Sequence, residues 1–406
     1  MKKDQKYYGE VWFVERENVK QFAIISFKDD DLLLETNLCS QKRVYKEPQI
    51  FGMFTGLGFI TFIDCRISFS SSGITETRVY RPKFSFISDQ HQIDAINLKF
   101  REFSVINDSI VDWVNHCAWY DTIEQKLLVK EFKDEFEVAG KELIITLNQY
   151  QQFSTQRKEL NIKNRGSISF ELTTPIDFLE AVELYNQFQK GLQLLFGGSK
   201  KFERFSFKCL SCNQWQEVYY NDKKLSKSTH NYVHTEYEKV KSDLGTVLNA
   251  VYSNKKFQFC LDKLMENFIS KQVSHNKRFT NSIATYEAFS KLYSGIAKNN
   301  LGKYIKHYKR IFILLGKFED EEWKTFPNKV IRSRDYHIHS NLENRNVYTE
   351  FELLYISFLF DFVVGYLLLE SLKVSNYLLE KFIMHSNNVF IDMKKTNRIL
   401  GFNPFK

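Results

Sequence analysis

The chain has 406 residues, which is enough for two or three domains that each bury a core. Hydrophobic residues make up 43% and charged residues 26%, and this balance excludes a largely disordered chain. The net charge of +8 is unevenly distributed: residues 1–200 hold 25 Lys and Arg against 28 Asp and Glu, whereas residues 201–406 hold 32 against 21. A basic C-terminal half is expected of a domain that meets a polyanion, although solvated helix faces would explain the same excess.

No segment of the sequence predicts export or a membrane span. Residues 1–6 are charged but lack the apolar core of a signal peptide. The most apolar run, 353–369, has Asp361 at its centre, so we expect a buried helix and no membrane association. A cytoplasmic location with reduced cysteines follows from the same observations.

The six cysteines offer one pair with metal-like spacing, Cys209 and Cys212. A structural zinc would need two further ligands, which His230 and His234 could supply. The alternative is a strand end with two small hydrophobic side chains. We favour the strand end and expect no metal and no cofactor.

The first half of the chain alternates between apolar and polar residues, as strands do. The predicted strands are 10–14, 21–27, 31–35, 51–62, 66–70, 77–80, 83–88, 94–103, 126–132, 135–138, 141–147 and 167–172. Three glycines within 51–62 suggest bulges or close backbone approach in a sheet. So many short strands favour a sandwich or an open barrel.

A helix is predicted near 175–195, with Thr173 or Thr174 as its N-cap and Pro175 as its first residue. A strand pair at 204–210 and 215–220 closes this module, and 221–227 is the best linker candidate. We therefore expect a β-rich N-terminal domain at 1–222.

From residue 228 to 406 the periodicity is helical. The predicted helices are 237–253, 257–270, 278–293, 301–315, 350–372 and 376–387. Pro327 is expected to break the pattern. The sequence as a whole predicts an α+β protein with a β-rich N-terminal module and an all-helical C-terminal domain.

Chemistry is concentrated between Pro327 and the apolar run, where Arg332, Arg334, Asp335, His337 and His339 fall within eight residues. Arginine clamps phosphate with a planar fork of donors, and histidine moves protons near neutral pH. Together these residue types can cleave RNA without a metal. An Arg–Asp pair with two histidines can also be a cluster of salt bridges and helix caps that serves only the fold.

The stretch Arg334-Asp335-x-x-x-His339 resembles the arginine–histidine signature of the HEPN superfamily. Two further segments resemble ApeA-type HEPN domains: 277–289, as an early helix, and 348–372, as the closing helix. The N-terminal half is similar to the domain that precedes HEPN in these proteins, at 8–13, 58–65 and 97–113. The resemblance covers most of the chain, and its chemically specific part is the arginine–histidine pair.

The resemblance implies an anti-phage, abortive-infection endoribonuclease that leaves 2′,3′-cyclic phosphate ends without a metal. Arg334 would then bind phosphate, His339 would transfer a proton and Asp335 would orient a neighbouring Arg or His. Arg332 and His337 would contact substrate. Implied partners are RNA, with tRNA, mRNA and phage RNA all open as targets, and a phage-derived trigger. The N-terminal module would sense this trigger or restrain the nuclease. The alternative is a catalytically inactive HEPN module that binds nucleic acid or regulates.

Geometry adds one constraint to this hypothesis. On a regular helix, Arg334 and His339 would be offset by roughly 140° around the axis. Either the backbone is irregular after Pro327, or two chains pool their residues at a twofold axis, an arrangement for which HEPN nucleases are known. The apolar helix, with Ser357, Asp361 and Gly365 in one row, would suit a homodimer through the helical domain.

Overall fold

The computed structural model describes residues 1, 4–28, 31–39, 46–71, 76–92, 94–114, 119–121, 123–124, 126–129, 131–156, 159–196, 204–210, 214–221, 235–269, 274–296, 300–339, 343 and 346–399. Of these, the side chains of 109, 119–121, 126–128, 155, 156, 159, 196, 269, 338, 339 and 388–399 are not described. The chain forms two compact units. The first is β-rich and comprises 1–137, 142–185 and 200–227; the second is helical and comprises 138–141, 186–199 and 228–406.

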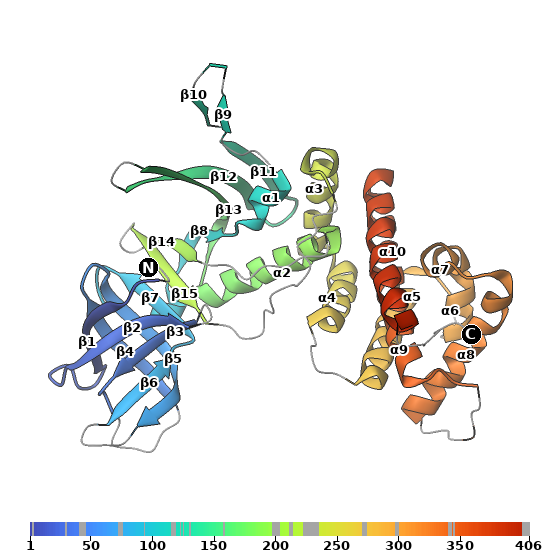
Figure 1. Cartoon of the computed structure of the whole chain (residues 1–406), viewed down its shortest axis with the longest axis horizontal. Coiled ribbons are helices and arrows are strands. Elements are labelled where there is room, and N and C mark those ends of the chain that lie inside the picture. The colour runs from blue at the N-terminus through green and yellow to red at the C-terminus, as the bar shows by residue number, and fades with distance from the viewer. Residues whose placement is uncertain are drawn as a thin grey trace. The chain divides into compact units, whose positions relative to one another are not determined.

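Six antiparallel strands close into a barrel at the N-terminal end of the first unit (Figure 1). They are β1 (Tyr7–Phe13), β2 (Gln21–Lys28), β3 (Asp31–Thr36), β4 (Lys46–Phe54), β5 (Gly58–Ser71) and β6 (Thr77–Arg81). Neighbours follow the order β5-β4-β1-β2-β3-β6, and β6 pairs again with β5. Alternate side chains fill the interior, among them the fully buried Val11, Ile25 and Phe62. The predicted barrel-like module is confirmed, and closure removes its free strand edges.

The strand predicted at 51–62 is in fact a hairpin of β4 and β5. Gly56 and Gly58 adopt φ of +77° and +83° in the turn, a conformation that glycine reaches without steric cost. Gly52 meets the other expectation, close approach within the sheet, because a Cβ there would lie 2.7 Å from the Phe54 ring.

A seven-strand extension continues the sheet from β5 in the order β7-β15-β14-β8-β13-β12-β11. Its strands are β7 (Phe84–Ser88), β8 (Phe100–Ile106), β11 (Phe132–Val138), β12 (Leu143–Gln156), β13 (Glu159–Ile176), β14 (Phe205–Cys209) and β15 (Trp215–Tyr220). The unit also contains a short helix α1 (Ser109–Val114), a 3-10 turn (Ala95–Asn97) and a separate hairpin of β9 (Trp119–Asp121) with β10 (Lys126–Leu128). The β12–β13 hairpin is much longer than the predicted strands and is prominent in Figure 1.

Phenylalanines make the core of this extension. Phe103 stacks between Phe170 and Phe205, with ring centroids 4.5 and 5.0 Å away, and Phe178 meets Phe205 edge-on. Phe178 is the first residue of α2 (Phe178–Phe196), so this contact fixes the start of the helix against the sheet.

The predicted start of α2 was wrong by three residues. Pro175 lies within β13, and the cap is Asp177, whose Oδ1 accepts from the Glu180 backbone N–H at 3.0 Å. Glu180 reciprocates by accepting from the Asp177 N–H at 2.8 Å. This capping box satisfies two N–H groups that Thr173 or Thr174 would have left unpaired.

The second unit contains eight further helices along the described residues (Figure 1). They are α3 (Tyr237–Ser253), α4 (Lys255–Ile269), α5 (His275–Tyr293), α6 (Leu301–His307), α7 (Lys309–Gly316), α8 (Asp320–His339), α9 (Glu350–Ser371) and α10 (Asn376–Ile399). The predicted helix at 301–315 is two helices, because the backbone leaves helical geometry at Tyr308.

The apolar helix α9 is the centre of this unit and packs against α4, α5, α7 and α10. It is long and apolar enough for a membrane span, but 89% of its apolar window is buried inside the protein. This confirms the predicted buried helix. Gly365 admits α10, since a Cβ there would lie 2.7 Å from the Phe382 ring. The chain's own helices therefore cover α9, and its apolar faces give no argument for a dimer.

Helix α8 corrects the expectation that Pro327 breaks the pattern. The helix passes through Pro327 and continues to His339. An interior proline costs about 3 kcal/mol or more. Buried Trp323, Phe326 and Val330 offset this cost, with the rings of Phe326 and Phe312 only 5.6 Å apart. An irregular backbone after Pro327 is thus excluded as the way to bring Arg334 and His339 together.

Candidate active site

Helix α8 presents one face of the arginine–histidine segment to a cavity of about 460 Å³. Ile331, Arg334 and Asp335 reach it together because residues three and four apart share a helix face. Helices α5 and α6 and the residue before α6 supply the other walls, with Glu287, Ala288, Lys291, Asn300, Leu301, Gly302 and Tyr304. A side chain at Gly302 would meet Ile331 at 2.9 Å, so glycine lets α6 approach α8.

Arg334 forms an ion pair with Glu287 across this cavity, at 3.4 Å between Nη2 and Oε1. Each side chain is 29% exposed. Burial raises the pKa of the Glu287 carboxyl; Arg334 opposes this shift and Asp335 adds to it. The Nε of Arg334 is buried and has no hydrogen-bond partner. The guanidinium is therefore held at one edge and has donor capacity left for an anion.

Asp335 lines the cavity and has no ion pair with a described Arg or His, so the orienting role predicted for it stays a prediction. Glu287 makes that contact to Arg334 instead. Of two neighbouring residues on α5, Glu287 borders the cavity, whereas Tyr286 is fully buried against Phe360 and Phe312. Sequence reasoning missed Lys291, whose spacing of four residues from Glu287 on α5 was the available signal.

His337 and Arg332, the predicted substrate contacts, do not line this cavity. The His337 ring is partly buried against Phe279, with centroids 6.4 Å apart, and its Nε2 is buried without a partner. Burial lowers the pKa of His337, whereas a hydrogen bond to the Tyr348 backbone and the charge of Glu350 oppose the shift. Arg332 is exposed. The two positions thus have different surroundings from the Arg334 face.

His339 is the last residue of α8, and its side chain lies outside the described residues. Its backbone position still constrains it. Five residues beyond Arg334 on a regular helix, the backbone position of His339 is offset by roughly 140° around the axis. The two positions therefore lie on different faces of α8.

The end of α8 is fixed to the start of α9 by Ser333, which is fully buried. Its hydroxyl donates to the Lys329 carbonyl at 2.8 Å and accepts from the Tyr348 N–H at 2.8 Å. Thr349 and Glu352 then form a capping box that begins α9. The C-terminal part of α8 and the start of α9 are consequently held together.

A second ion pair ties α5 to α9. Asp361 is fully buried; its Oδ2 lies 3.2 Å from Nη2 of Arg278, and its Oδ1 accepts from Asn267 at 2.8 Å. Arg278 also donates to the Asn267 carbonyl at 2.8 Å. The sequence placed Asp361 on a row with Ser357 and Gly365 suited to a partner helix. The structure uses these positions within one chain.

The candidate zinc ligands are only partly described. Cys209 is buried at the end of β14, as expected of a small hydrophobic side chain at a strand end. Cys212, His230 and His234 lie outside the described residues.

The comparisons with known proteins agree with the architecture. The family model for ApeA N-terminal domain 1 matches residues 6–251, and the model for the Apea-like HEPN domain matches residues 219–377. No curated protein and no solved structure matches the chain. The second match contains Arg334, Asp335 and His339, so the candidate site falls within an identified HEPN domain. The chain belongs to the ApeA family, in which a β-rich N-terminal domain precedes an ApeA-like HEPN domain of the anti-phage nuclease type.

Proposed function

We propose that the helical domain is an endoribonuclease that cleaves RNA without a metal and acts in anti-phage, abortive-infection defence. Arg334 binds the scissile phosphate and stabilises the charge that develops on it. His339 transfers a proton. Asp335 and Lys291 set the local potential of the cavity, and Arg332 contacts the RNA strand outside it.

The reaction uses the 2′-hydroxyl of the substrate as its nucleophile. The 2′-oxygen forms a bond to phosphorus and loses its proton, while the bond from phosphorus to the 5′-oxygen breaks and that oxygen gains a proton. The products are a 2′,3′-cyclic phosphate and a 5′-hydroxyl. A positioned histidine contributes about 10²–10⁴-fold to such proton transfers. A guanidinium fork supplies positive charge where the phosphate becomes more negative.

The observation that carries this proposal is the placement of Arg334. It stands on a regular helix at an open cavity, 3.4 Å from a carboxylate that fixes one edge, while its buried Nε has no acceptor. The guanidinium is 29% exposed and lines the cavity, so the donors that Glu287 does not take can face a phosphate there.

Two protons must move, and each chain has one His339 that its helix directs away from Arg334. We therefore propose a composite site in a homodimer, in which Arg334 of one chain acts with His339 of the partner chain. This arrangement needs no distortion of α8. The argument for a dimer is the angular offset between Arg334 and His339 on α8, and the apolar surface of α9 plays no part in it.

The test is cleavage of RNA by the purified full chain in excess EDTA. We expect undiminished activity and 2′,3′-cyclic phosphate ends, read by mass spectrometry of the products. Activity that disappears with chelator and returns with Mg²⁺ would contradict the mechanism. RNA that binds and stays intact under all conditions would favour the inactive binding module.

The composite site has a separate test. Arg334→Ala and His339→Ala chains are mixed, dissociated and reassociated, and compared with each variant alone. We expect the mixture to recover activity that neither homodimer has, since half of the reassociated dimers contain one chain of each kind and each of these carries one intact composite site. No recovery, with mixed dimers confirmed by native mass spectrometry, would place the whole site in one chain.

A further inference from the structure

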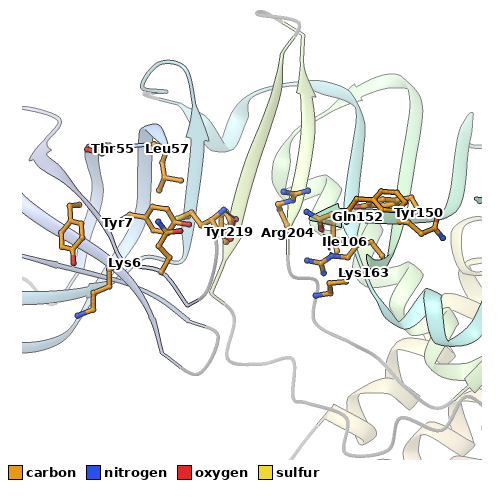
Figure 2. A pocket seen from close by; sticks show the side chains of 17 residues that line it. Lys6, Tyr7, Thr55, Leu57, Ile106, Tyr150, Gln152, Lys163, Arg204 and Tyr219 are labelled. Carbon is orange, nitrogen blue, oxygen red and sulfur yellow. Dashed lines mark hydrogen bonds between the residues drawn. The ribbon is translucent and has the colours of Figure 1, made fainter. Parts of the chain in front are cut away.

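The β-rich unit has a cavity of about 1250 Å³ that is distinct from the HEPN site. It lies between one end of the barrel and the β12–β13 hairpin. Figure 2 shows Lys6 and Tyr7 on the barrel side and Tyr150, Lys163 and Arg204 on the other, with Tyr219 between them. Drug-sized ligands occupy cavities of about 300–1,000 Å³, so this one has room for a larger molecule.

The charge of the cavity is one-sided. Lys6, Lys163, Arg165 and Arg204 line it, and none of the described lining residues is acidic. General basicity is not the cause, because residues 1–200 hold more Asp and Glu (28) than Lys and Arg (25). The cations are concentrated at this place in an otherwise acidic half of the chain. Such a concavity raises the local concentration of anions.

The four cations are of two kinds. Arg165 is 2.7 Å from Asp108, and Arg204 is 2.9 Å from Glu217, so carboxylates behind the wall orient both guanidinium groups. Lys6 and Lys163 are exposed and have no ion pair among the described residues. The Nε of Arg204 is buried without a hydrogen-bond partner. The cavity therefore keeps uncompensated positive charge and one unused buried donor.

Aromatic and amide side chains lie among these cations. On the β12–β13 hairpin, Tyr150 is directly opposite Arg165 and Gln152 is directly opposite Lys163. The two pairs are two residues apart, so all four side chains share one face of the sheet. Phe153 is 50% exposed at the same cavity. Rings beside cations are the combination that holds stacked bases and phosphates of single-stranded nucleic acid.

We propose that this cavity binds nucleoside phosphates, as a short single-stranded RNA or as free nucleotides. Lys6 and Lys163 contact phosphates, Tyr150 stacks on a base, and the Arg165 and Arg204 guanidinium groups line the path of the backbone. The cavity volume favours more than one nucleotide. The site makes the β-rich domain a nucleic-acid-sensing module in its own right, independent of whether the HEPN domain cuts.

The test uses the full chain and a fluorescent single-stranded oligonucleotide of about six 2′-O-methyl nucleotides, a length within the site size of small single-strand-binding folds. The probe lacks the 2′-hydroxyl nucleophile, so binding is measured whatever the activity of the HEPN site. We expect saturable binding by fluorescence anisotropy. The double variant Lys6→Glu/Lys163→Glu should weaken it at least tenfold, and the slope of log K against log salt should become shallower by about 0.7 per lost phosphate contact.

Two variants sharpen the assignment. Tyr150→Ala should weaken binding about fivefold or more through lost stacking. Lys28→Glu is the matched control, since Lys28 is an exposed lysine of the same unit outside the cavity, and it should leave binding unchanged. Binding that is lost on Arg334→Ala and retained in the Lys6/Lys163 double variant belongs to the helical domain and would overturn the proposal.

Competition distinguishes the sources of the ligand. Unlabelled oligonucleotide that competes better than ATP supports a strand, and ATP that competes equally supports a free nucleotide at the same site. Inorganic tripolyphosphate or oligoglutamate that competes as well as either would overturn the proposal, because stacking of a base on the aromatic side chains would then contribute nothing to binding. No saturable binding of any probe would overturn it as well.

Discussion

Helix α5 carries two ion pairs of the same chemistry in different surroundings. Near its start Arg278 meets Asp361 of α9, and two to three turns later Glu287 meets Arg334 of α8. The Asp361 side chain is 0% exposed, whereas Glu287 and Arg334 are 29% exposed and border a cavity. We infer that an enclosed Arg–carboxylate pair contributes to the stability of the fold, whereas a pair that borders a cavity can bind substrate.

The partners of each pair support this division. Asp361 also accepts from Asn267, and Arg278 stacks on the Phe358 ring at 4.2 Å. Arg334 has one carboxylate at 3.4 Å and lines a cavity. The two pairs therefore differ in their exposure and in the cavity beside the second, because each of the two arginines has a buried Nε without an acceptor.

Substitution of the proposed catalytic residues should have the largest effect on activity. We expect Arg334→Ala and His339→Ala each to lower the rate of RNA cleavage by about 10²–10⁴-fold. Unfolding free energy should change little, because a partly exposed ion pair contributes about 0–1 kcal/mol. Cleavage kinetics together with denaturant unfolding measure both quantities.

A conservative variant serves as the control for this prediction. Arg334→Lys should rescue poorly, since an ammonium does not reproduce the bidentate fork. Arg332→Ala and His337→Ala should be milder in turnover. If positions 332 and 337 prove essential while 334 and 339 are dispensable, the assigned pair is wrong by two residues. If all four variants unfold, the cluster is structural.

Breaking the enclosed pair should act on stability. Arg278→Met leaves a buried carboxylate without its cation and should lower the unfolding free energy by about 3–5 kcal/mol. Hydrogen exchange of the α5 and α9 amides reports this for the helical domain alone. The double variant Arg278→Met/Asp361→Leu should recover most of the loss, since it removes both charges. An Arg278→Met chain as stable as the wild type would end the distinction between the two pairs.

The sequence predicted much of the fold because its signals were local. Alternation located most strands, and helical periodicity located α3, α4, α5 and α9 to within a few residues. Barrel closure through β5 and β6 was not predictable, since it depends on pairing and not on pattern. Helix α8 was missed because Pro327 outweighed the buried row Trp323, Phe326 and Val330, whose partner Phe360 is distant in sequence.

The residues of the candidate site also differ in whether local sequence could predict them. Arg334, Asp335 and His339 stood out because they are close together in the sequence. The Arg278–Asp361 pair had no local signal, because its members are 83 residues apart. Contacts of that range form only once packing has brought the helices together.

The enclosed pair should also give stability a pH dependence. Burial raises the pKa of Asp361 to about 6, against 3.8 for an unperturbed Asp, although Arg278 opposes the shift. The folded state therefore binds this proton more tightly than the unfolded state, and stability is lost as pH rises from about 4 to about 6. Over this range the free energy of unfolding falls by roughly 3 kcal/mol, at about 1.36 kcal/mol for each pH unit. Asp361→Asn should remove this slope from the helical domain's unfolding profile, and an unchanged slope would contradict the assignment.

The smallest expected effect belongs to Glu287, and it tests how the open pair works. Its carboxylate fixes one edge of Arg334 but also repels an incoming phosphate. Glu287→Gln keeps the shape and removes the charge, so we expect KM for RNA to fall by up to about fivefold, the limit set by a pair worth about 0–1 kcal/mol. The turnover number should fall by a similar factor, because Arg334 loses its fixed orientation. Glu321→Gln is the matched control, because it removes an exposed ion pair with Lys324 within α8, away from the cavity; neither constant should move. A Glu287→Gln chain whose KM rises would show that the carboxylate contributes to binding and does not compete with the phosphate.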